Sequence, residues 1–170
     1  GIRDQPRARG LGDVYKRQMV ATDTSEEALN LARKNSTNLG LDDRLELRLG
    51  SLFAPVLTGE CFDVVISNPP YVPDGDRDDL PPEVLDWEPH EALFAGSGGV
   101  SMLRKVAAGA AAVMEQGGLL ALEVGAGQAG EVASFMDSQD KLEDVRVLRD
   151  LAGIERIVTA VCSNERDEQG

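Results

Sequence analysis

The segment Asn68-Pro69-Pro70-Tyr71 combines residue types that can hold a flat NH2 group. A planar NH2 presents two N–H donors, and the side-chain oxygen of Asn68 and the carbonyl of Pro69 are acceptors for them. The ring of Tyr71 supplies a surface for its face, and the two prolines limit backbone motion and remove competing donors. Such acceptors favour the electron-rich nitrogen of a transfer transition state. The motif therefore predicts group transfer to an NH2 nitrogen without a metal; the alternative is a loop merely stiffened by prolines.

Two further candidates stand where strands are expected to end, which is where open α/β sheets bind ligands. Asp23 follows the apolar run MVATD, and its carboxylate can accept hydrogen bonds from both hydroxyls of a ribose. An acidic residue at a helix start also favours the helix dipole, and the sequence leaves both interpretations open. The segment Ser51-Leu52-Phe53 can border a flat adenine, although by itself it is only a loop with apolar residues.

The elements that must position these residues are visible as hydrophobic patterns. The first is a short strand at 19–23, followed by a helix at 24–40 with a capping box from Thr24 to Glu27 and a stop at Gly40. An alternating strand at 44–49 has one wetter face. The β-branched run 62–67 is typical of a strand buried on both faces of a parallel sheet, and it leads into Asn68.

The C-terminal half continues the alternation of helices and strands. A helix is expected at 100–118 and another at 128–138, with strands at 119–125, 145–150 and 155–162. Between these halves, residues 72–99 form a long acidic loop of the kind that is usually a functional lid or disordered. The acidic run of this loop is interpreted as exposed to solvent, and Trp87 as packing the loop onto the sheet. The run consists of Asp74, Asp76, Asp78 and Asp79. This order predicts an α/β sandwich with a mostly parallel sheet and a terminal antiparallel pair.

Composition narrows the class of partner. The chain has 170 residues and a formal net charge of −13, which argues against a nucleic-acid backbone as the main partner. No apolar stretch reaches the roughly 18 residues that a membrane span needs. Cys61 and Cys162 are interpreted as buried free thiols of a reduced, cytoplasmic protein. His90 is the single histidine, so no histidine-rich zinc site can be built, and we expect no metal.

The first eighteen residues differ from the rest of the chain. They are basic and aperiodic, and the stretch 9–18 looks like the in-frame translation of a transposon-end adaptor. Within them, Gly10-Leu11-Gly12 imitates a nucleotide-binding glycine loop, but no apolar strand precedes it. We therefore expect a non-native tail at 1–18, a partial catalytic domain at 19–163 and a charged tail at 164–170.

Several segments together resemble the release-factor glutamine methyltransferases (the HemK/PrmC group), which use S-adenosylmethionine. The resemblance runs from about 19 to 161 and is carried by ATDTSEEALNLARKN, ISNPPYVP, WEPHEALFAGSGG, LLALEVGAGQ and DLAGIERIV. Several amide and amine methyltransferases share Asn-Pro-Pro-Tyr, so that motif indicates a chemistry more than a substrate. The resemblance implies a Rossmann-like methyltransferase sandwich and methylation of a glutamine side-chain amide in the Gly-Gly-Gln motif of a peptide chain release factor.

The resemblance also implies roles for individual residues. Asp23 would bind the cofactor ribose, Leu52 would line the adenine site, and Asn68 would touch both cofactor and substrate. Residues 69–71, Pro-Pro-Tyr, would hold the substrate glutamine. Ser51 departs from the pattern, because an aspartate is frequent there in the family.

The larger departure is an absence. In the family a first strand and a glycine-rich cofactor loop should precede Met19, and residues 1–18 contain no counterpart of either. We therefore expect this 170-residue chain to bind S-adenosylmethionine weakly or not at all. Two rival functions stay open. One is a nucleic-acid methyltransferase acting on an exocyclic amine of adenine or guanine, where the same clamp would work. The other is a non-catalytic α/β fragment.

Overall fold

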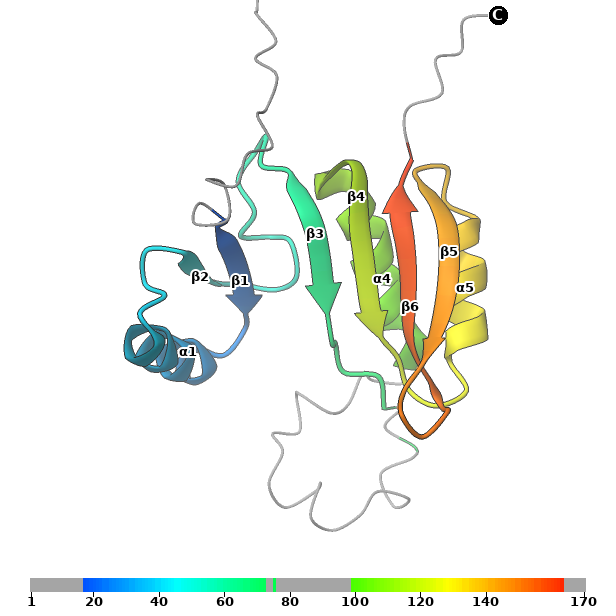
Figure 1. The fold of residues 1–170 in the computed structure, drawn as a ribbon, viewed down its shortest axis with the longest axis horizontal. Helices are drawn as coiled ribbons and strands as arrows, with labels where there is room; N and C mark the ends of the chain where they lie inside the picture. Colours follow the sequence, from blue (N-terminus) through cyan, green and yellow to red (C-terminus); the bar gives the residue numbers. More distant parts are fainter. Residues whose placement is uncertain (1–16, 73–74, 76–98, 164–170) are drawn as a thin grey trace, which may run out of the picture. The chain divides into compact units, whose positions relative to one another are not determined.

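The computed structural model describes residues 17–72, 75 and 99–163. The chain divides into two compact units, Gly1–Val56 and Leu57–Gly170, and each is described by itself. Among the described residues the strands form two sheets, one in each unit. Figure 1 labels the helices and strands along the chain.

The first unit is a strand–helix–strand element. Strand β1 (Met19–Asp23) leads into helix α1 (Glu26–Leu39), and strand β2 (Leu45–Leu49) returns parallel to β1. Because the strands are parallel, residues that follow Asp23 and Leu49 emerge at the same end of the pair, where the amide of Gly50 donates to the carbonyl of Asp23 at 2.9 Å.

Helix α1 begins one residue later than its capping box predicted. The N-cap is Ser25, not Thr24, and its hydroxyl accepts from the amide of Ala28. Asp23 explains the shift, since its carboxylate accepts from the amide of Ser25 at 2.7 Å and closes a turn ahead of the helix. The C-terminal stop is confirmed, because Gly40 has φ 65° in the left-handed region that glycine adopts without strain.

The second unit is a four-stranded mixed sheet with two helices. Its strands are β3 (Phe62–Ser67), β4 (Met114–Glu123), β5 (Leu142–Arg149) and β6 (Glu155–Cys162), in the order β3-β4-β6-β5. Strands β3 and β4 are parallel, whereas β6 is antiparallel to both β4 and β5. The predicted α/β class and the terminal antiparallel pair are confirmed.

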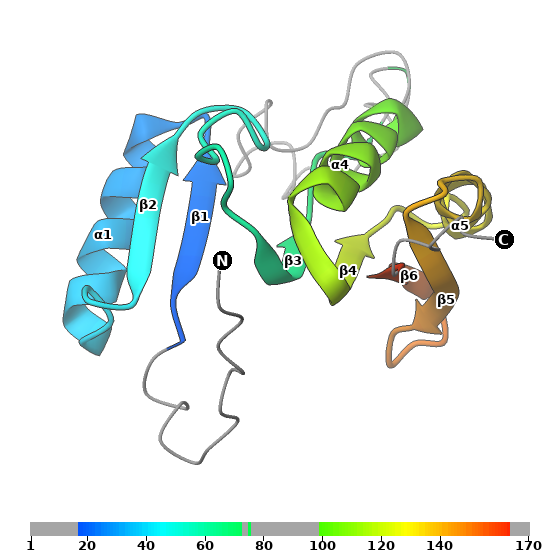
Figure 2. The ribbon, with the colours of Figure 1, turned by 90° about the horizontal axis from the view of Figure 1, so that it is seen from above.

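Helices α4 (Gly99–Val113) and α5 (Ala129–Asp137) pack on one face of this sheet (Figure 2). The core lies between the helices and the sheet, and its fully buried larger side chains among the described residues are Leu103, Val106, Leu120, Leu122, Val124, Val132, Met136 and Val158. An ion pair of 2.7 Å between Arg104 and Glu131 joins the two helices. The small residues Ala107 and Ala110 let α4 approach the sheet closely, as its alanine-rich sequence suggests.

Strand β3 differs from its prediction. Its pattern favoured burial on both faces, but Val64 is 49% exposed and Ile66 is 77% exposed. Both residues alternate with Val65, and in the described residues the helices of this unit cover only the face to which Val65 belongs. The β-branched residues therefore predicted the strand correctly. They did not predict whether one or both of its faces are covered by other elements.

Two smaller differences concern the ends of elements and the thiols. Helix α4 ends at Val113, and β4 begins at once with Met114, which pairs with Phe62 before a register shift. Cys162 is buried as expected, whereas Cys61, in the loop before β3, is exposed; both are free.

None of the described helices is long and apolar enough to cross a membrane.

Candidate functional site

The Asn-Pro-Pro-Tyr motif lies directly beyond the carboxyl end of β3. Ser67 is the last residue of the strand and pairs with Leu122 of the parallel strand β4. The segments that follow β3 and β4 therefore leave the sheet at the same edge, at the lower end of both arrows in Figure 1. This is the position that the sequence predicted for the motif.

Within the motif, the polar side chain faces solvent and the apolar side chains are wholly or partly buried. Asn68 is exposed, while Pro69 is buried and Tyr71 is half-buried. In the part of the chain that the structure describes, the carboxamide of Asn68 has no hydrogen-bond partner. Among these residues, the oxygen of the Asn68 carboxamide is therefore available to accept from an N–H of a ligand. The buried proline that follows limits the motion of the backbone that carries this carboxamide.

Tyr71 is held by the segment that follows β4. The side-chain amide of Gln128 donates to the carbonyl oxygen of Tyr71 at 2.8 Å, and its oxygen accepts from the amide of Gly125 at 3.0 Å. The sequence patterns assign no role to Gln128. A signal was present, because it follows the predicted strand 119–125 and so belongs to the ligand-binding edge of a parallel pair.

In the first unit, the structure brings Asp23 and Leu52 to one end of the β1–β2 pair. The hydroxyl of Thr22 donates to the carbonyl of Leu52 at 2.9 Å, which holds the loop after β2 beside the end of β1. Leu52 is half-buried and has φ 51°, a left-handed conformation that is uncommon for leucine. Asp23 is exposed, and one of its carboxylate oxygens accepts from Ser25.

This arrangement combines a hydrogen-bond acceptor with an apolar surface, which are groups compatible with an adenosine. One carboxylate oxygen of Asp23 is engaged in the turn, and within the described residues the other has no hydrogen-bond partner and can accept from ribose hydroxyls. The side chain of Leu52 supplies apolar surface for a base. Asp23 thus closes the turn ahead of α1 and, among the described residues, keeps one acceptor oxygen free, so both interpretations of this residue are compatible with the geometry.

The candidate residues therefore form two groups. Asp23 and Leu52 belong to the first unit, and Asn68, Pro69, Pro70 and Tyr71 belong to the second. Within each group the structure places the members together. Among the described residues, no three side chains of His, Cys, Asp or Glu gather in a way that suits a metal ion. The acidic run, Trp87 and His90 lie outside the described residues.

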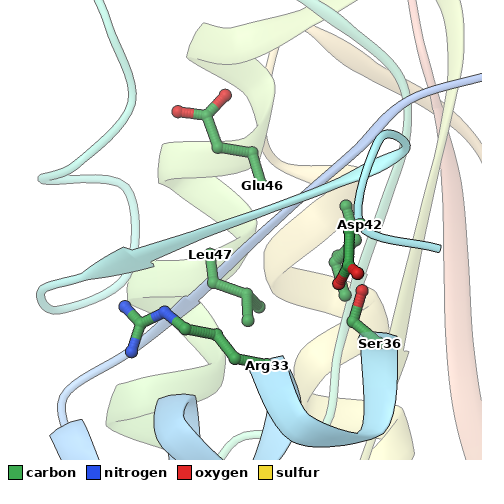
Figure 3. A pocket seen from close by; sticks show the side chains of 6 residues that line it. Arg33, Ser36, Asp42, Glu46 and Leu47 are labelled. Atoms are coloured by element: carbon green, nitrogen blue, oxygen red, sulfur yellow. The ribbon is translucent and has the colours of Figure 1, made fainter. Parts of the chain in front are cut away.

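A shallow pocket in the first unit lies elsewhere. Its lining comes from the second half of α1, including Arg33 and Ser36, and from the start of β2, including Leu45 (Figure 3). Since α1 runs back from Asp23, this pocket is at the amino end of the parallel strands. Ligands of α/β sheets bind at the opposite end, so the pocket is not part of the candidate site.

The comparisons with known proteins decide the relationship. Residues of this chain are 45% identical over 141 positions to a release factor glutamine methyltransferase of Cereibacter sphaeroides, covering 83% of the chain and 50% of that protein. A second, from Gloeobacter violaceus, is 44% identical over 138 positions, covering 81% of the chain and 48% of that protein. The chain is homologous to the release factor glutamine methyltransferases. It spans about half the length of the curated relatives it matches. No family model matches it.

Solved structures agree with this homology at the level of the fold. A methyltransferase from Pyrococcus furiosus superposes with a TM-score of 0.62 at 15% identity, covering 88% of this chain and 65% of that chain. An O-methyltransferase from Bacillus cereus, solved in complex with SAH, gives 0.55 at 13% identity, covering 86% and 63%. This homologue of the release factor glutamine methyltransferases therefore has a methyltransferase fold, as its sequence predicted.

Proposed function

We propose that the chain is the catalytic part of an S-adenosylmethionine-dependent methyltransferase that modifies the side-chain amide nitrogen of a glutamine in a peptide chain release factor. The observation that carries this proposal is the exposed carboxamide of Asn68, which has no hydrogen-bond partner among the described residues and lies on a proline-restricted segment beyond β3. The chain that carries it is homologous to release factor glutamine methyltransferases. The partner is then a release factor, and the compartment is the cytoplasm, where translation ends.

The chemistry assigned to the motif is binding and orientation. An amide nitrogen is a poor nucleophile because its lone pair is delocalised into the carbonyl. Asn68 Oδ1 and the carbonyl of Pro69 accept the two N–H groups, which favours the form with more electron density on nitrogen. The ring of Tyr71 covers one face of the amide. The amide nitrogen would gain the methyl group that S-adenosylmethionine supplies, as the carbon–sulfur bond of the sulfonium breaks to leave a thioether, and would give up one proton to water.

The cofactor would be held by the first unit. The carboxylate of Asp23 suits the ribose hydroxyls, and the side chain of Leu52 suits the adenine. Bound there, S-adenosylmethionine would supply an electrophilic methyl group carried on a sulfonium.

A transfer assay tests the proposal with protein expressed from the complete native reading frame, so that any residues encoded before Met19 are present. Methyl-labelled cofactor is offered with a release factor, with the same factor carrying Gln→Glu in its Gly-Gly-Gln motif, and with total transfer and ribosomal RNA. We expect label only in the unaltered release factor. Label in RNA and none in release factor would replace this proposal with the exocyclic-amine alternative.

The role of Asn68 is tested in the same assay by Asn68→Ala. Removing one preorganised acceptor is expected to lower kcat by roughly 10²-fold or more. Asn30→Ala is the matched control, because Asn30 is an exposed asparagine of α1 that bonds only Arg33 among the described side chains. An Asn68→Ala protein that transfers methyl groups at the unaltered rate would remove Asn68 from the mechanism.

A further inference from the structure

The side chain of Gln128 joins two loops that are 57 positions apart in sequence. Its Nε2 donates to the carbonyl of Tyr71, and its Oε1 accepts from the amide of Gly125. Both bonds are partly buried, and both end on main-chain atoms. One glutamine therefore ties the end of the Asn-Pro-Pro-Tyr motif to the loop after β4.

The surrounding backbone leaves room for this connection only because two of its residues are glycines. A Cβ at Gly125 would lie 2.9 Å from Oε1 of Gln128 and 3.0 Å from Cδ2 of Tyr71. A Cβ at Gly99, the first residue of α4, would overlap the carbonyl oxygen of Tyr71. The loop after β3, the loop after β4 and the start of α4 thus meet around the main chain of Tyr71.

The position of the bond decides what it controls. The rings of Pro69 and Pro70 fix φ at about −65°, and a following proline restricts Asn68 and Pro69 to extended conformations. Backbone freedom in the motif is therefore concentrated at Tyr71, the residue without such a restriction. A hydrogen bond to the Tyr71 carbonyl fixes the orientation of the Tyr71–Val72 peptide and so removes the rotation that the prolines leave.

We propose that Gln128 is a positioning residue, which holds the Tyr71 end of the motif in the geometry that receives the substrate amide. This inference rests on the proposed function and extends it to a residue outside the motif. Gln128 acts through Tyr71 and takes no part in the bond changes. Its loss would allow the Tyr71 end of the motif to move away from the substrate amide, and displacements of about 1 Å can cost 10²-fold in rate.

The first test replaces Gln128 by methionine, which has similar length and no amide. In protein from the complete reading frame we expect kcat for release factor to fall at least 10-fold, while the dissociation constant for S-adenosylmethionine changes less than 3-fold. Gln139→Met is the matched control, because Gln139 also bonds a main-chain carbonyl, that of Phe135, at the far end of α5. Its kcat should stay within 2-fold of the unaltered protein.

A second variant separates positioning from general stability. Gln128→Glu keeps an acceptor for the amide of Gly125 but, when ionised, has no donor for the carbonyl of Tyr71. Protonation of the introduced carboxylate restores an O–H donor. Because an ordinary glutamate has a pKa of about 4.3, the ratio of its kcat to that of the unaltered protein should rise as pH falls from 7 toward 5, whereas the ratio for Gln128→Met should stay flat.

A readout on the chain itself does not depend on catalysis. In ¹⁵N-labelled protein, the amide of Gly125 should exchange with solvent faster in Gln128→Met than in the unaltered chain, because its acceptor is gone. The outcomes are distinguishable. Unaltered protein that fails to methylate release factor overturns the proposed function and this inference with it. Active protein whose Gln128→Met variant keeps its kcat overturns this inference alone.

Discussion

The hydroxyl of Thr22 in β1 donates a hydrogen bond of 2.9 Å to the carbonyl of Leu52 in the loop after β2. Leu52 is one of two described non-glycine residues with positive φ. A leucine in the left-handed region costs about 1–2 kcal/mol, so the surrounding contacts must hold it there. The Thr22 hydroxyl is such a contact, since it fixes the carbonyl that follows the strained torsion.

We therefore expect Thr22→Val to weaken cofactor binding. Valine keeps the branched shape that suits β1 but has no donor for Leu52, so the loop can leave the conformation that presents the Leu52 side chain. Loss of one hydrogen bond is worth about 0.5–1.5 kcal/mol, or roughly 2- to 12-fold in affinity. Calorimetric titration of S-adenosylmethionine into protein from the complete reading frame measures it.

Thr22→Ser is the control for that titration, because serine retains the hydroxyl. It should bind the cofactor within 2-fold of the unaltered protein. Equal affinities for the Val and Ser variants would show that the Thr22 bond does not shape the adenine side of the site.

A second prediction concerns the glycine at the start of α4. Alanine at a helical position is ordinarily more favourable than glycine by about 1 kcal/mol. At Gly99 the added methyl would overlap the Tyr71 carbonyl, and overpacking costs about 1–3 kcal/mol, so the clash outweighs the propensity. Gly99→Ala should lower the free energy of unfolding and reduce kcat, as measured by urea titration and the methyl-transfer assay.

The matched control is Gly130→Ala in α5. A Cβ there meets nothing within 4 Å, so only the helix propensity remains. This variant should be more stable by about 0.5–1 kcal/mol, with unchanged kcat. Stabilisation of both variants to the same degree would mean that Tyr71 moves freely away from α4.

The elements that carry the site could be predicted because their signals are local. The runs before Asp23 and Asn68 are apolar and β-branched, and both residues do follow strands, β1 and β3. Gly40 ends α1 because a left-handed C-cap is a property of the residue itself. The start of α1 was misplaced by one residue, because Thr24 and Ser25 are both good caps and the turn at Asp23 decides between them.

The remaining features depend on which segments meet in space. The bond from Gln128 to Tyr71 exists because β4 lies parallel to β3, and no pattern along the chain specifies that neighbour. The exposure of Ile66 depends on which face of the sheet the helices cover, whereas its β-branched type is the same on either face. Roles at such positions follow from topology, not from residue type.

A third prediction tests the core of the second unit. Leu103 of α4 is fully buried, and Leu103→Ala should lower the free energy of unfolding by about 2–5 kcal/mol through lost transfer energy and a residual cavity. Leu151→Ala is the control, since Leu151 is fully exposed in the turn between β5 and β6 and its truncation should stay within about 0.5 kcal/mol. Urea unfolding followed by circular dichroism compares the two. Similar losses would place Leu103 outside a packed core.

The last prediction uses the buried thiol at the end of β6. Burial raises the pKa of Cys162, with Lys141 acting in the opposite direction. Because the folded-state pKa is above that of the unfolded chain, the unfolded chain ionises first as pH rises, so stability is retained below the ordinary thiol pKa and lost above it. Between pH 7.5 and pH 10, the unaltered protein should therefore lose more free energy of unfolding than Cys162→Ala, which has no thiol to titrate there. Parallel losses in the two proteins would show that Cys162 titrates alike in both states. A thiol reagent at pH 8 gives an independent check, because the exposed Cys61 should react at once and Cys162 only after unfolding.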